Sequence, residues 1–368
     1  MEEEIIPYGP ELAAEVCELQ THLWGPDVGL NRRYLEWKYH RNPYLLEPVI
    51  GLAAAEGRLV AMVGMYGVPW EVGDPPRAFL GPCAGDWVVA PSHRGRGLST
   101  RVMAAAFADL AARDVDHAFT MTWNERSFRI GLASGWRSIG PLLPLVRYDP
   151  AGLLARVGRR ARRLAGRHEH VYRLLDRHLG RPSAGRVPVT IDTQPHSDAM
   201  AELRARVRVD GRIRQRPDPA YIDWRYRNPF SHYRFLYWHG QRLEGYLVLQ
   251  TSARRRESEV RVLEWEATNP SVRSALLRTA LDRGRFERVT IWSATLPTDA
   301  QEMLAASGFA PEPRAGMESV ELPTVHVHPT REAPSDTAAG EAPAWTIAGM
   351  PLLDRRNWDV RMADSDGF

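Results

Sequence analysis

The chain has 368 residues, of which 44% are hydrophobic, and this length favours two domains over one. Its formal net charge is only +3, so nucleic acid is not an expected partner, because binding to phosphate backbones usually needs a strongly basic surface. Cys17 and Cys83 form no spaced framework, and the chain shows neither a signal core nor an apolar run of about 18 residues. We therefore expect a cytoplasmic protein without a membrane span.

The first 150 residues predict an α/β fold with a mixed, mostly antiparallel sheet. Within residues 50–69, apolar segments flank Glu56-Gly57-Arg58, which predicts a hairpin of two strands. Residues 97–113 carry apolar side chains at helical spacing. An antiparallel start followed by alternating strands and helices indicates a sheet of α+β character with helices on both faces.

A tight turn joins the strand that ends at residues 86–90 to the helix at 97–113. The turn reads Arg94-Gly95-Arg96-Gly97-Leu98-Ser99, and Thr100 follows it. Glycine allows backbone N–H groups to approach a ligand closely, and the first amides and the dipole of a helix favour a phosphate. The pattern predicts a diphosphate site, with an ordinary surface turn as the alternative.

Residues 151–184 combine apolar side chains with a cluster of arginines, which predicts a basic helical connector. One interpretation is a patch for anionic lipid or nucleic acid. We favour a solvated linker helix, because Gly158 and Gly166 weaken helix formation.

Segments on the two sides of this connector repeat in the same order. Residues 34–43 return as 221–229, Asp86-Trp87 returns as Glu264-Trp265, and Gly135-Trp136 returns as Gly308-Phe309. The offsets fall from 187 (221 − 34) through 178 (265 − 87) to 173 (308 − 135), as expected if the second copy has shorter loops. The repeat indicates duplication of one domain.

We therefore divide the chain into four parts. These are a first domain at 1–150, the connector at 151–184, a degenerate second domain at 185–323, and a linker with a carboxyl-terminal tail at 324–368. The second copy lacks a glycine turn after its strand. We therefore expect it to support the first domain or to form one wall of the site where the acceptor substrate binds. Trp37 and Trp224 occur in both copies, which favours a structural role for them.

The glycine turn and the segment after it resemble the GNAT superfamily of acyl-CoA-dependent acyltransferases. The family's coenzyme turn reads Arg or Gln, two residues, Gly, one residue, then Gly or Ala, and Arg94, Gly97 and Ser99 occupy those places. Residues 124–136 resemble the family's next helix, which starts at an Asn and closes with a Gly-aromatic pair. The resemblance covers residues 1–148 and, more faintly, 186–322, and it implies two tandem GNAT-like domains.

The resemblance also implies a coenzyme site and a reaction. Acetyl-CoA or another acyl-CoA would bind with its diphosphate on residues 94–100, and Asn124 and Ser127 would contribute to the same site. Pantetheine would lie where the strand of Val88 and Val89 splays from the strand at 116–122. A backbone N–H near Val89 would polarise the thioester carbonyl.

The leaving-group acid is unresolved, because the family's usual tyrosine position is occupied by Gly131. The departing thiolate has a low enough pKa that protonation is not required. Ser127, Ser134 and Tyr66 are weak candidates for the acid.

Asp86 is our candidate general base, since it lies three residues before Val89 on the strand that borders the acceptor pocket. The alternative is a structural carboxylate that accepts hydrogen bonds from backbone donors or pairs with an arginine. Cys83 could carry an acyl group, but a core thiol is the favoured interpretation because no histidine stands in an activating pattern beside it.

Two features near the carboxyl terminus bear on metals and ligands. His326 and His328 are spaced for one strand face but lack further ligands, so no metal is expected. Asp364 and Asp366 could bind a cation or an aminosugar, although a solvated acidic tail is the favoured interpretation.

The sequence thus predicts an acyl-CoA-dependent N-acyltransferase, with acetyl as the leading acyl group. The acceptor would be an amine of a small metabolite such as an aminosugar, which attacks the thioester directly. One alternative is an aminoacyl-tRNA-dependent peptide-bond-forming transferase of similar fold. Another is a non-catalytic acyl-CoA-binding scaffold, which the glycine at position 131 would favour.

Overall fold

A computed structural model describes most of the chain. The described residues are 3–122, 125–148, 189–207, 210–252, 259–284, 286–312, 322–331 and 343–365. The connector predicted at 151–184 lies outside them. None of the described helices is both long and apolar enough to cross a membrane.

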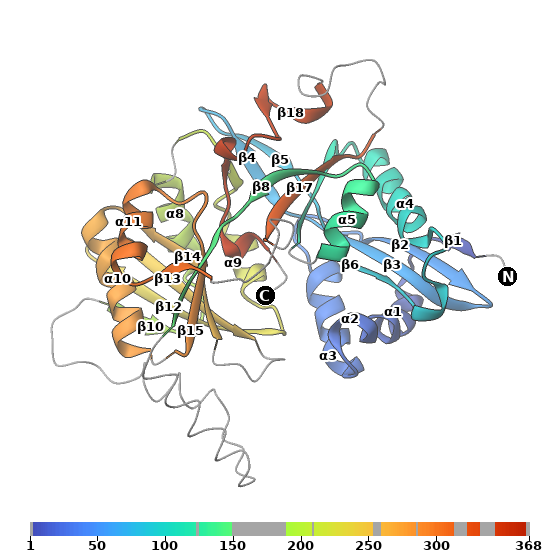
Figure 1. Ribbon diagram of the computed structural model, residues 1–368, viewed down its shortest axis with the longest axis horizontal. Coiled ribbons are helices and arrows are strands. Elements are labelled where there is room, and N and C mark those ends of the chain that lie inside the picture. The colour runs from blue at the N-terminus through green and yellow to red at the C-terminus, as the bar shows by residue number, and fades with distance from the viewer. Residues whose placement is uncertain are drawn as a thin grey trace, which may run out of the picture.

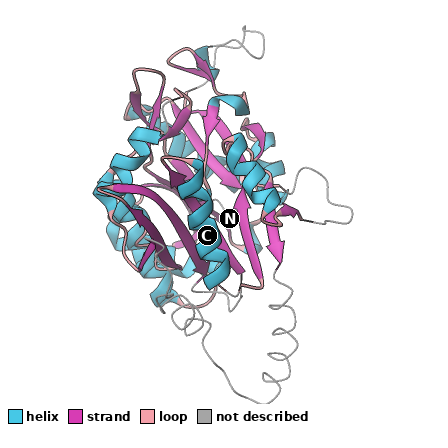
Figure 2. Cartoon of the chain, turned by 90° about the vertical axis from the view of Figure 1, so that its left-hand side faces the viewer, coloured by secondary structure: helices cyan, strands magenta, loops and turns pink. Residues whose placement is uncertain are grey.

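The first copy forms a seven-stranded mixed sheet in the order β1-β2-β3-β6-β7-β17-β8, flanked by helices (Figures 1 and 2). Its elements in chain order are β1 (Glu4–Ile6), α1 (Ala13–Leu19), α2 (Thr21–Trp24), α3 (Val28–Leu35), a π-helical turn η2 (Glu36–His40), β2 (Val49–Ala55), β3 (Arg58–Tyr66), β6 (Cys83–Val89), α4 (Leu98–Ala112), β7 (His117–Thr122) and α5 (Glu125–Ala133). The predicted hairpin is confirmed as β2–β3, and the helix predicted at 97–113 is confirmed as α4.

The second copy forms another seven-stranded sheet, in the order β10-β12-β13-β14-β15-β9-β16. Its elements are β10 (Val189–Asp192), α8 (Ser197–Val207), α9 (Pro219–Arg225), β12 (Ser231–His239), β13 (Leu243–Ser252), β14 (Glu259–Ala267), α10 (Pro270–Arg283), β15 (Arg288–Trp292), α11 (Thr298–Ala306) and β16 (Ala310–Pro311). Both sheets pass from antiparallel strands to one parallel pair, β6–β7 in the first and β14–β15 in the second. The α/β fold with mixed sheets is as predicted.

The two copies exchange strands. β8 (Arg137–Pro141) stays in the first sheet, whereas β9 (Pro144–Tyr148) pairs with β15 and β16 of the second sheet. In return, β17 (Thr324–Pro329) pairs with β7 and β8 of the first sheet. Figure 1 shows these segments crossing between the two lobes. Each sheet is therefore completed by a strand from outside the range, 1–150 or 185–323, that was predicted for its domain.

A smaller sheet also joins the copies, in the order β20-β11-β4-β5. Its strands are β20 (Trp358–Asp359), β11 (Ile213–Gln215), β4 (Pro69–Val72) and β5 (Arg77–Leu80). A short hairpin of β18 (Thr346–Ile347) and β19 (Met350–Pro351) comes just before β20 in the chain. Within this sheet the buried guanidinium of Arg214 donates to Glu71 Oε1 at 2.7 Å, which links β11 of one copy to β4 of the other.

The repeated tryptophans meet at the centre of the interface between the copies. Trp37 Nε1 donates to the Trp224 carbonyl at 2.7 Å, and Trp224 Nε1 donates to the Trp37 carbonyl at the same distance. Their rings stack with centroids 4.9 Å apart. A reciprocal contact of this kind is the signature of a twofold interface, here between two copies within one chain. The structural role predicted for both residues is confirmed, but they pack against each other across the interface.

Candidate functional site

The glycine turn faces open space at the start of α4. After η3 (Pro91–His93), Gly95 and Gly97 adopt left-handed conformations with φ values of 79° and 73°, which glycine reaches at little cost. Gly97 is the N-cap residue of α4. A Cβ atom added at Gly95 or Gly97 would meet no heavy atom within 4 Å. The sequence therefore folds into a glycine-lined rim with room beside it.

The first amides of α4 lie at this rim. The Gly97 carbonyl accepts from Thr100 N and Arg101 N at 3.1 and 3.2 Å, and the cap residue supplies no side-chain acceptor. Among the residues that the structure describes, no backbone N–H from 94 to 99 donates to a protein acceptor. Such amides, at the positive end of a 15-residue helix, suit an anion.

Three arginines lie at the turn, and they differ in their hydrogen-bond and ion-pair partners. Arg94 Nε donates to the Val89 carbonyl at 3.1 Å and so ties the turn to the end of β6. Arg96 pairs with Glu3 at 3.0 Å, and Arg101 lies 3.8 Å from the same carboxylate. The hydrogen bond from Arg96 is the main reason that the pKa of Glu3 is lowered. A diphosphate on the turn would compete with Glu3 for these two cations.

A bulge in β6 accompanies a splay between β6 and β7. Against β3, Gly85 pairs with Gly64 and Val88 pairs with Met62, so two residues of β6 oppose one residue of β3. The first bulged residue, Asp86, has a φ of 53°. Within the described residues, the β6–β7 ladder consists of one pair, Cys83 with Phe119. Beyond Cys83 the two parallel strands diverge.

The register of β6 directs the Val89 backbone toward this splay. Ala90 N donates to the Val60 carbonyl at 2.8 Å, so residues 60 and 90 form a hydrogen-bonded pair in the antiparallel ladder. Because bonded and non-bonded pairs alternate, Val88 faces β3 and the N–H of Val89 points to the opposite side. The structure thus gives Val89 the orientation that a hydrogen bond to a ligand in the splay would require.

The side chain of Asp86 is fully buried and accepts four hydrogen bonds. Its Oδ1 accepts from Trp24 Nε1 and Lys38 Nζ at 3.0 and 3.2 Å. Its Oδ2 accepts from Gln20 Nε2 and Tyr39 OH at 3.0 and 2.9 Å. A carboxylate offers about four lone-pair positions, so these donors occupy its accepting capacity.

Lys38 is the only lysine of the chain, and its ammonium group is buried against Asp86. Nζ also lies 5.1 to 5.3 Å from the ring centroids of Tyr34, Tyr39 and Tyr66, a distance suited to cation–π attraction. Sequence reasoning found Asp86 but missed these partners. The single lysine inside a repeated aromatic segment was the available signal, since the second copy has Arg225 at the matching position.

The other predicted residues fall into two groups. Asn124 lies outside the described residues, and Ser127 lies on α5 without a described side chain. Cys83 and Tyr66 are buried, at 1% and 2% exposure, and Cys83 is not part of a disulfide. The structure thus brings Val88, Val89 and the turn 94–100 to one end of β6, with Asp86 buried beneath them.

His326 and His328 lie on the exchanged strand β17. His326 is 1% exposed, and burial lowers its pKa to about 4, while the ring of His328 stacks on Phe107 with centroids 4.3 Å apart. Across the described residues, no group of three or more metal-ligating side chains occurs. Packing of the two rings accounts for the spacing of these histidines.

The corresponding region of the second copy has a side-chain cap at the start of α10 and a bridge between its strands, and a pocket of about 510 Å³ lies beside residues 267–270. Asn269 caps α10, and its side chain accepts from Val272 N at 3.0 Å. The tail then bridges the ends of β14 and β15, because Arg361 Nε donates to Glu266 at 3.0 Å and Val360 N donates to Thr295 Oγ1 at 3.1 Å.

This tail differs from the solvated segment that the sequence predicted. Asp364 is 1% exposed, and its carboxylate accepts from Arg361 N at 2.7 Å as part of a capping turn. The tail is ordered because its carbonyls accept from a buried arginine: Arg225 donates to Ala363 O and to Ser365 O, both at 2.6 Å. Asp366 lies outside the described residues.

Comparisons with known proteins agree on one family. Residues 12–136 and residues 214–317 match two different family profiles, each described as an acetyltransferase (GNAT) domain. A search of curated proteins finds no significant match.

Solved structures of similar fold include three with related descriptions. A probable N-acyltransferase from Enterococcus faecalis has 13% identity and a TM-score of 0.57, over 90% of this chain and 73% of that one. A GCN5-related N-acetyltransferase from Anabaena variabilis has 11% identity and the same TM-score and coverage. A tandem GNAT protein of clavulanic acid biosynthesis has 13% identity and a TM-score of 0.50, over 91% of this chain and all of that one. At these identities the structures show likeness of fold.

Proposed function

Because the chain belongs to the GNAT superfamily of acyltransferases, with two such domains in tandem, we propose that its first domain transfers an acyl group from acyl-CoA to a small amine. Acetyl is the leading acyl group, and an aminosugar is one candidate acceptor. The observation that carries the proposal is the open glycine turn, whose amides from 94 to 99 meet no protein acceptor among the described residues. We propose the cytoplasm as the location and expect no resident metal.

The proposed reaction is direct attack. The diphosphate of acyl-CoA rests on the turn from Arg94 to Ser99, beside Thr100, and its pantetheine arm follows β6 into the splay. The N–H of Val89 donates to the thioester oxygen as negative charge develops there. The neutral amine attacks the carbonyl carbon and its nitrogen gives up one proton to water. The C–S bond breaks, and the sulfur leaves as a thiolate that can take a proton from water.

The proposed role of Asp86 follows from its burial. Since four donors occupy the carboxylate, it takes the proton of an incoming ammonium group only after water displaces one of them. The same four bonds hold Asp86 at its positive φ and so maintain the β6 bulge. We propose both roles, and they predict different outcomes when the charge of Asp86 is removed.

A non-catalytic acyl-CoA-binding scaffold is the second candidate. The observation that favours it is Gly131 on α5, which stands where the family's acid tyrosine is usually found. A scaffold would bind acyl-CoA without consuming it. Release of free thiol from acetyl-CoA in the presence of a panel of amines separates the two functions.

Two matched glycine variants test the coenzyme site. Gly97 and Gly57 share a φ of 73° and open space around a built Cβ, so tryptophan strains both positions similarly. Gly57 lies in the β2–β3 hairpin, outside the turn but at the same end of the sheet, so it also controls for a bulky side chain near the site. We expect acetyl-CoA at 100 times its Kd to stabilise the wild type and Gly57→Trp by about 2.7 kcal/mol, and Gly97→Trp by almost nothing. Equal stabilisation of both variants in a thermal-shift titration would remove the turn from the site.

A further inference from the structure

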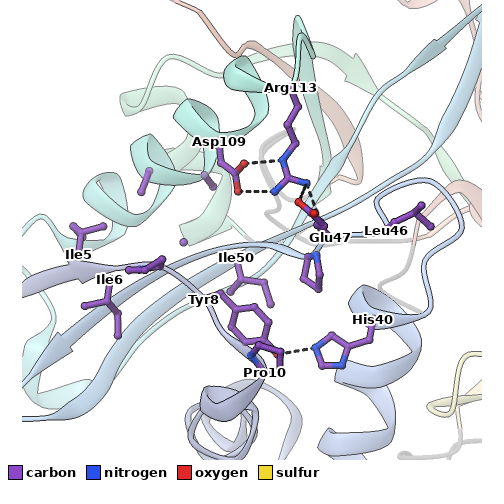
Figure 3. A pocket seen from close by; sticks show the side chains of 15 residues that line it. Ile5, Ile6, Tyr8, Pro10, His40, Leu46, Glu47, Ile50, Asp109 and Arg113 are labelled. Atoms are coloured by element: carbon purple, nitrogen blue, oxygen red, sulfur yellow. Dashed lines mark hydrogen bonds and ion pairs between the residues drawn. The ribbon is translucent and has the colours of Figure 1, made fainter.

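A cavity of about 720 Å³ opens in the first copy, away from the glycine turn (Figure 3). It is lined by the end of β1, residues 46–48, the start of β2 and the second half of α4. From Leu98, where the turn meets α4, to Asp109 at the cavity is about 16 Å along the helix. None of residues 86–99 lines the cavity, so it is separate from the proposed coenzyme site.

The walls of the cavity are mainly apolar. Ile5, Ile6 and Ile50 contribute side chains, and Leu46 stands at the mouth with 80% of its surface exposed. β1 ends where Ile6 pairs with Leu52, so the start of β2 continues beyond its last β1 partner and borders the cavity. An apolar body seated here would remove this surface from water.

One end of the cavity presents a hydroxyl oxygen. Tyr8 OH lies 2.7 Å from His40 Nε2, and His40 Nδ1 lies 2.9 Å from a Glu36 carboxylate oxygen. The hydrogen bond from His40 is the main reason that the pKa of Glu36 is lowered, so Glu36 accepts and Nδ1 donates. In the neutral ring Nε2 then accepts from Tyr8, which leaves the lone pairs of the Tyr8 oxygen available to a ligand's donor.

The other end of the cavity carries net negative charge. Arg113 pairs with Asp109 at 2.7 Å and lies 3.5 Å from Glu47. One cation against two carboxylates leaves a charge of −1 (+1 − 2) at this end. Figure 3 shows this group and the Tyr8–His40 pair on opposite sides of Ile50.

We propose that this cavity binds a small organic cation with a ring-sized apolar body, an ammonium group at the Asp109–Glu47 end and a hydroxyl group at the Tyr8 end. The ammonium group neutralises the excess charge, the ring covers Ile50 and Leu46, and the hydroxyl donates to Tyr8. This site binds its ligand without acyl-CoA, so it does not depend on the proposed function.

Three probes of the same size test the proposal by calorimetry on the full chain without acyl-CoA. Tyramine has both polar ends, phenethylamine lacks the hydroxyl, and 4-hydroxyphenylacetate carries a carboxylate in place of the ammonium. We expect tyramine to bind about fivefold more tightly than phenethylamine, from one hydrogen bond, and at least about fivefold more tightly than the acid.

Substitutions of the lining residues test whether the probes bind in this cavity. Tyr8→Phe should lower tyramine affinity to that of phenethylamine and leave phenethylamine binding unchanged, which also shows that the fold is intact. Glu47→Gln with Asp109→Asn changes the charge at this end from −1 to +1 and should make the acid bind more tightly than tyramine. Glu302→Gln with Asp282→Asn, which removes two exposed carboxylates on α11 and α10, serves as the charge-matched control. No detectable binding of any probe, or tyramine binding that these variants leave unchanged, overturns the proposal.

Discussion

The two copies have a carboxylate at the matching position of β6 and β14, but they differ at the start of the helix that follows the strand. In the first copy α4 begins at a glycine whose neighbouring amides face open space, while in the second copy the Asn269 side chain accepts from Val272 N at the start of α10. The first copy's splay has one ladder pair, whereas β14 and β15 pair at three positions before the tail bridges them. A few residues at the helix start thus leave the first amides open in one copy and provide a side-chain cap in the other.

The buried carboxylates also differ in their partners. Asp86 accepts from a lysine, whereas Glu264 accepts from Tyr226 OH at 2.7 Å and from Tyr246 OH, with Arg204 3.9 Å away. Burial and the adjacent Glu264 raise the pKa of Tyr226, so this tyrosine stays protonated and donates. The cation at the lysine's matching position, Arg225, instead holds the tail. Both copies therefore bury an ion pair at this carboxylate, but the pair is close in the first copy, at 3.2 Å, and long in the second, at 3.9 Å.

The largest expected effect is at Asp86. Asp86→Asn leaves the buried Lys38 ammonium without a counter-charge and should lower the free energy of unfolding by about 3–5 kcal/mol. The matched change in the second copy, Glu264→Gln, keeps an acceptor for the two tyrosines and breaks only the longer ion pair to Arg204, so it should cost less. Denaturant melts of the two variants measure the difference, and equal losses would contradict the distinction between the copies.

The same pair separates the two roles of Asp86. Adding Lys38→Met to Asp86→Asn removes both charges and should restore most of the stability. If Asp86 accepts the proton, the double variant folds but loses rate and the acidic limb of its pH–rate profile. If Asp86 only maintains the bulge, turnover and its pH profile recover together with stability.

The symmetric tryptophans should respond symmetrically. Trp37→Phe and Trp224→Phe each remove one of two matching hydrogen bonds at 2.7 Å across the buried interface. We expect each to cost about 1–3 kcal/mol, with the two values equal within error. Clearly unequal losses of unfolding free energy in urea melts would show that the two hydrogen bonds contribute unequally to the interface between the copies.

The smallest effect is expected in the second copy's cap. Asn269→Gly removes the side-chain acceptor at the start of α10 and should cost only a few tenths of a kcal/mol. It should create no acyl-CoA binding, because the tail still bridges β14 and the segment after β15. Calorimetry with Gly97→Trp as the background isolates any new site, and measurable binding there would show that the tail bridge does not exclude acyl-CoA.

The sequence predicted local features well and long-range ones poorly. The β2–β3 hairpin, α4 and the duplication depend on short patterns of apolar residues and on direct repetition, which a single sequence displays. The exchange of β9 and β17 depends on pairing between residues about 140 to 200 positions apart, which no local pattern encodes. The tail was predicted to be solvated because its acidic residues look polar, while its burial depends on Arg225 and Glu266 far away in the chain.

The local part of the candidate site could likewise be predicted from the sequence, whereas its long-range part could not. Its turn is contiguous, so the glycine spacing, the flanking strand and helix, and the resemblance to the GNAT turn together marked residues 94–99. The surroundings of Asp86 come from Gln20, Trp24, Lys38 and Tyr39, which the fold gathers from three separate segments. A carboxylate on a strand next to the turn looked like a base, and the donors that fill it were visible only in three dimensions.

The most direct measurement is backbone amide hydrogen exchange, followed residue by residue with and without acetyl-CoA. If the glycine turn holds the diphosphate, the amides from Gly95 to Ser99 become protected on binding, the Val89 amide follows, and the amides around Asn269 keep their exchange rates. Binding that leaves residues 95–99 unprotected, or that protects both copies alike, would contradict the account.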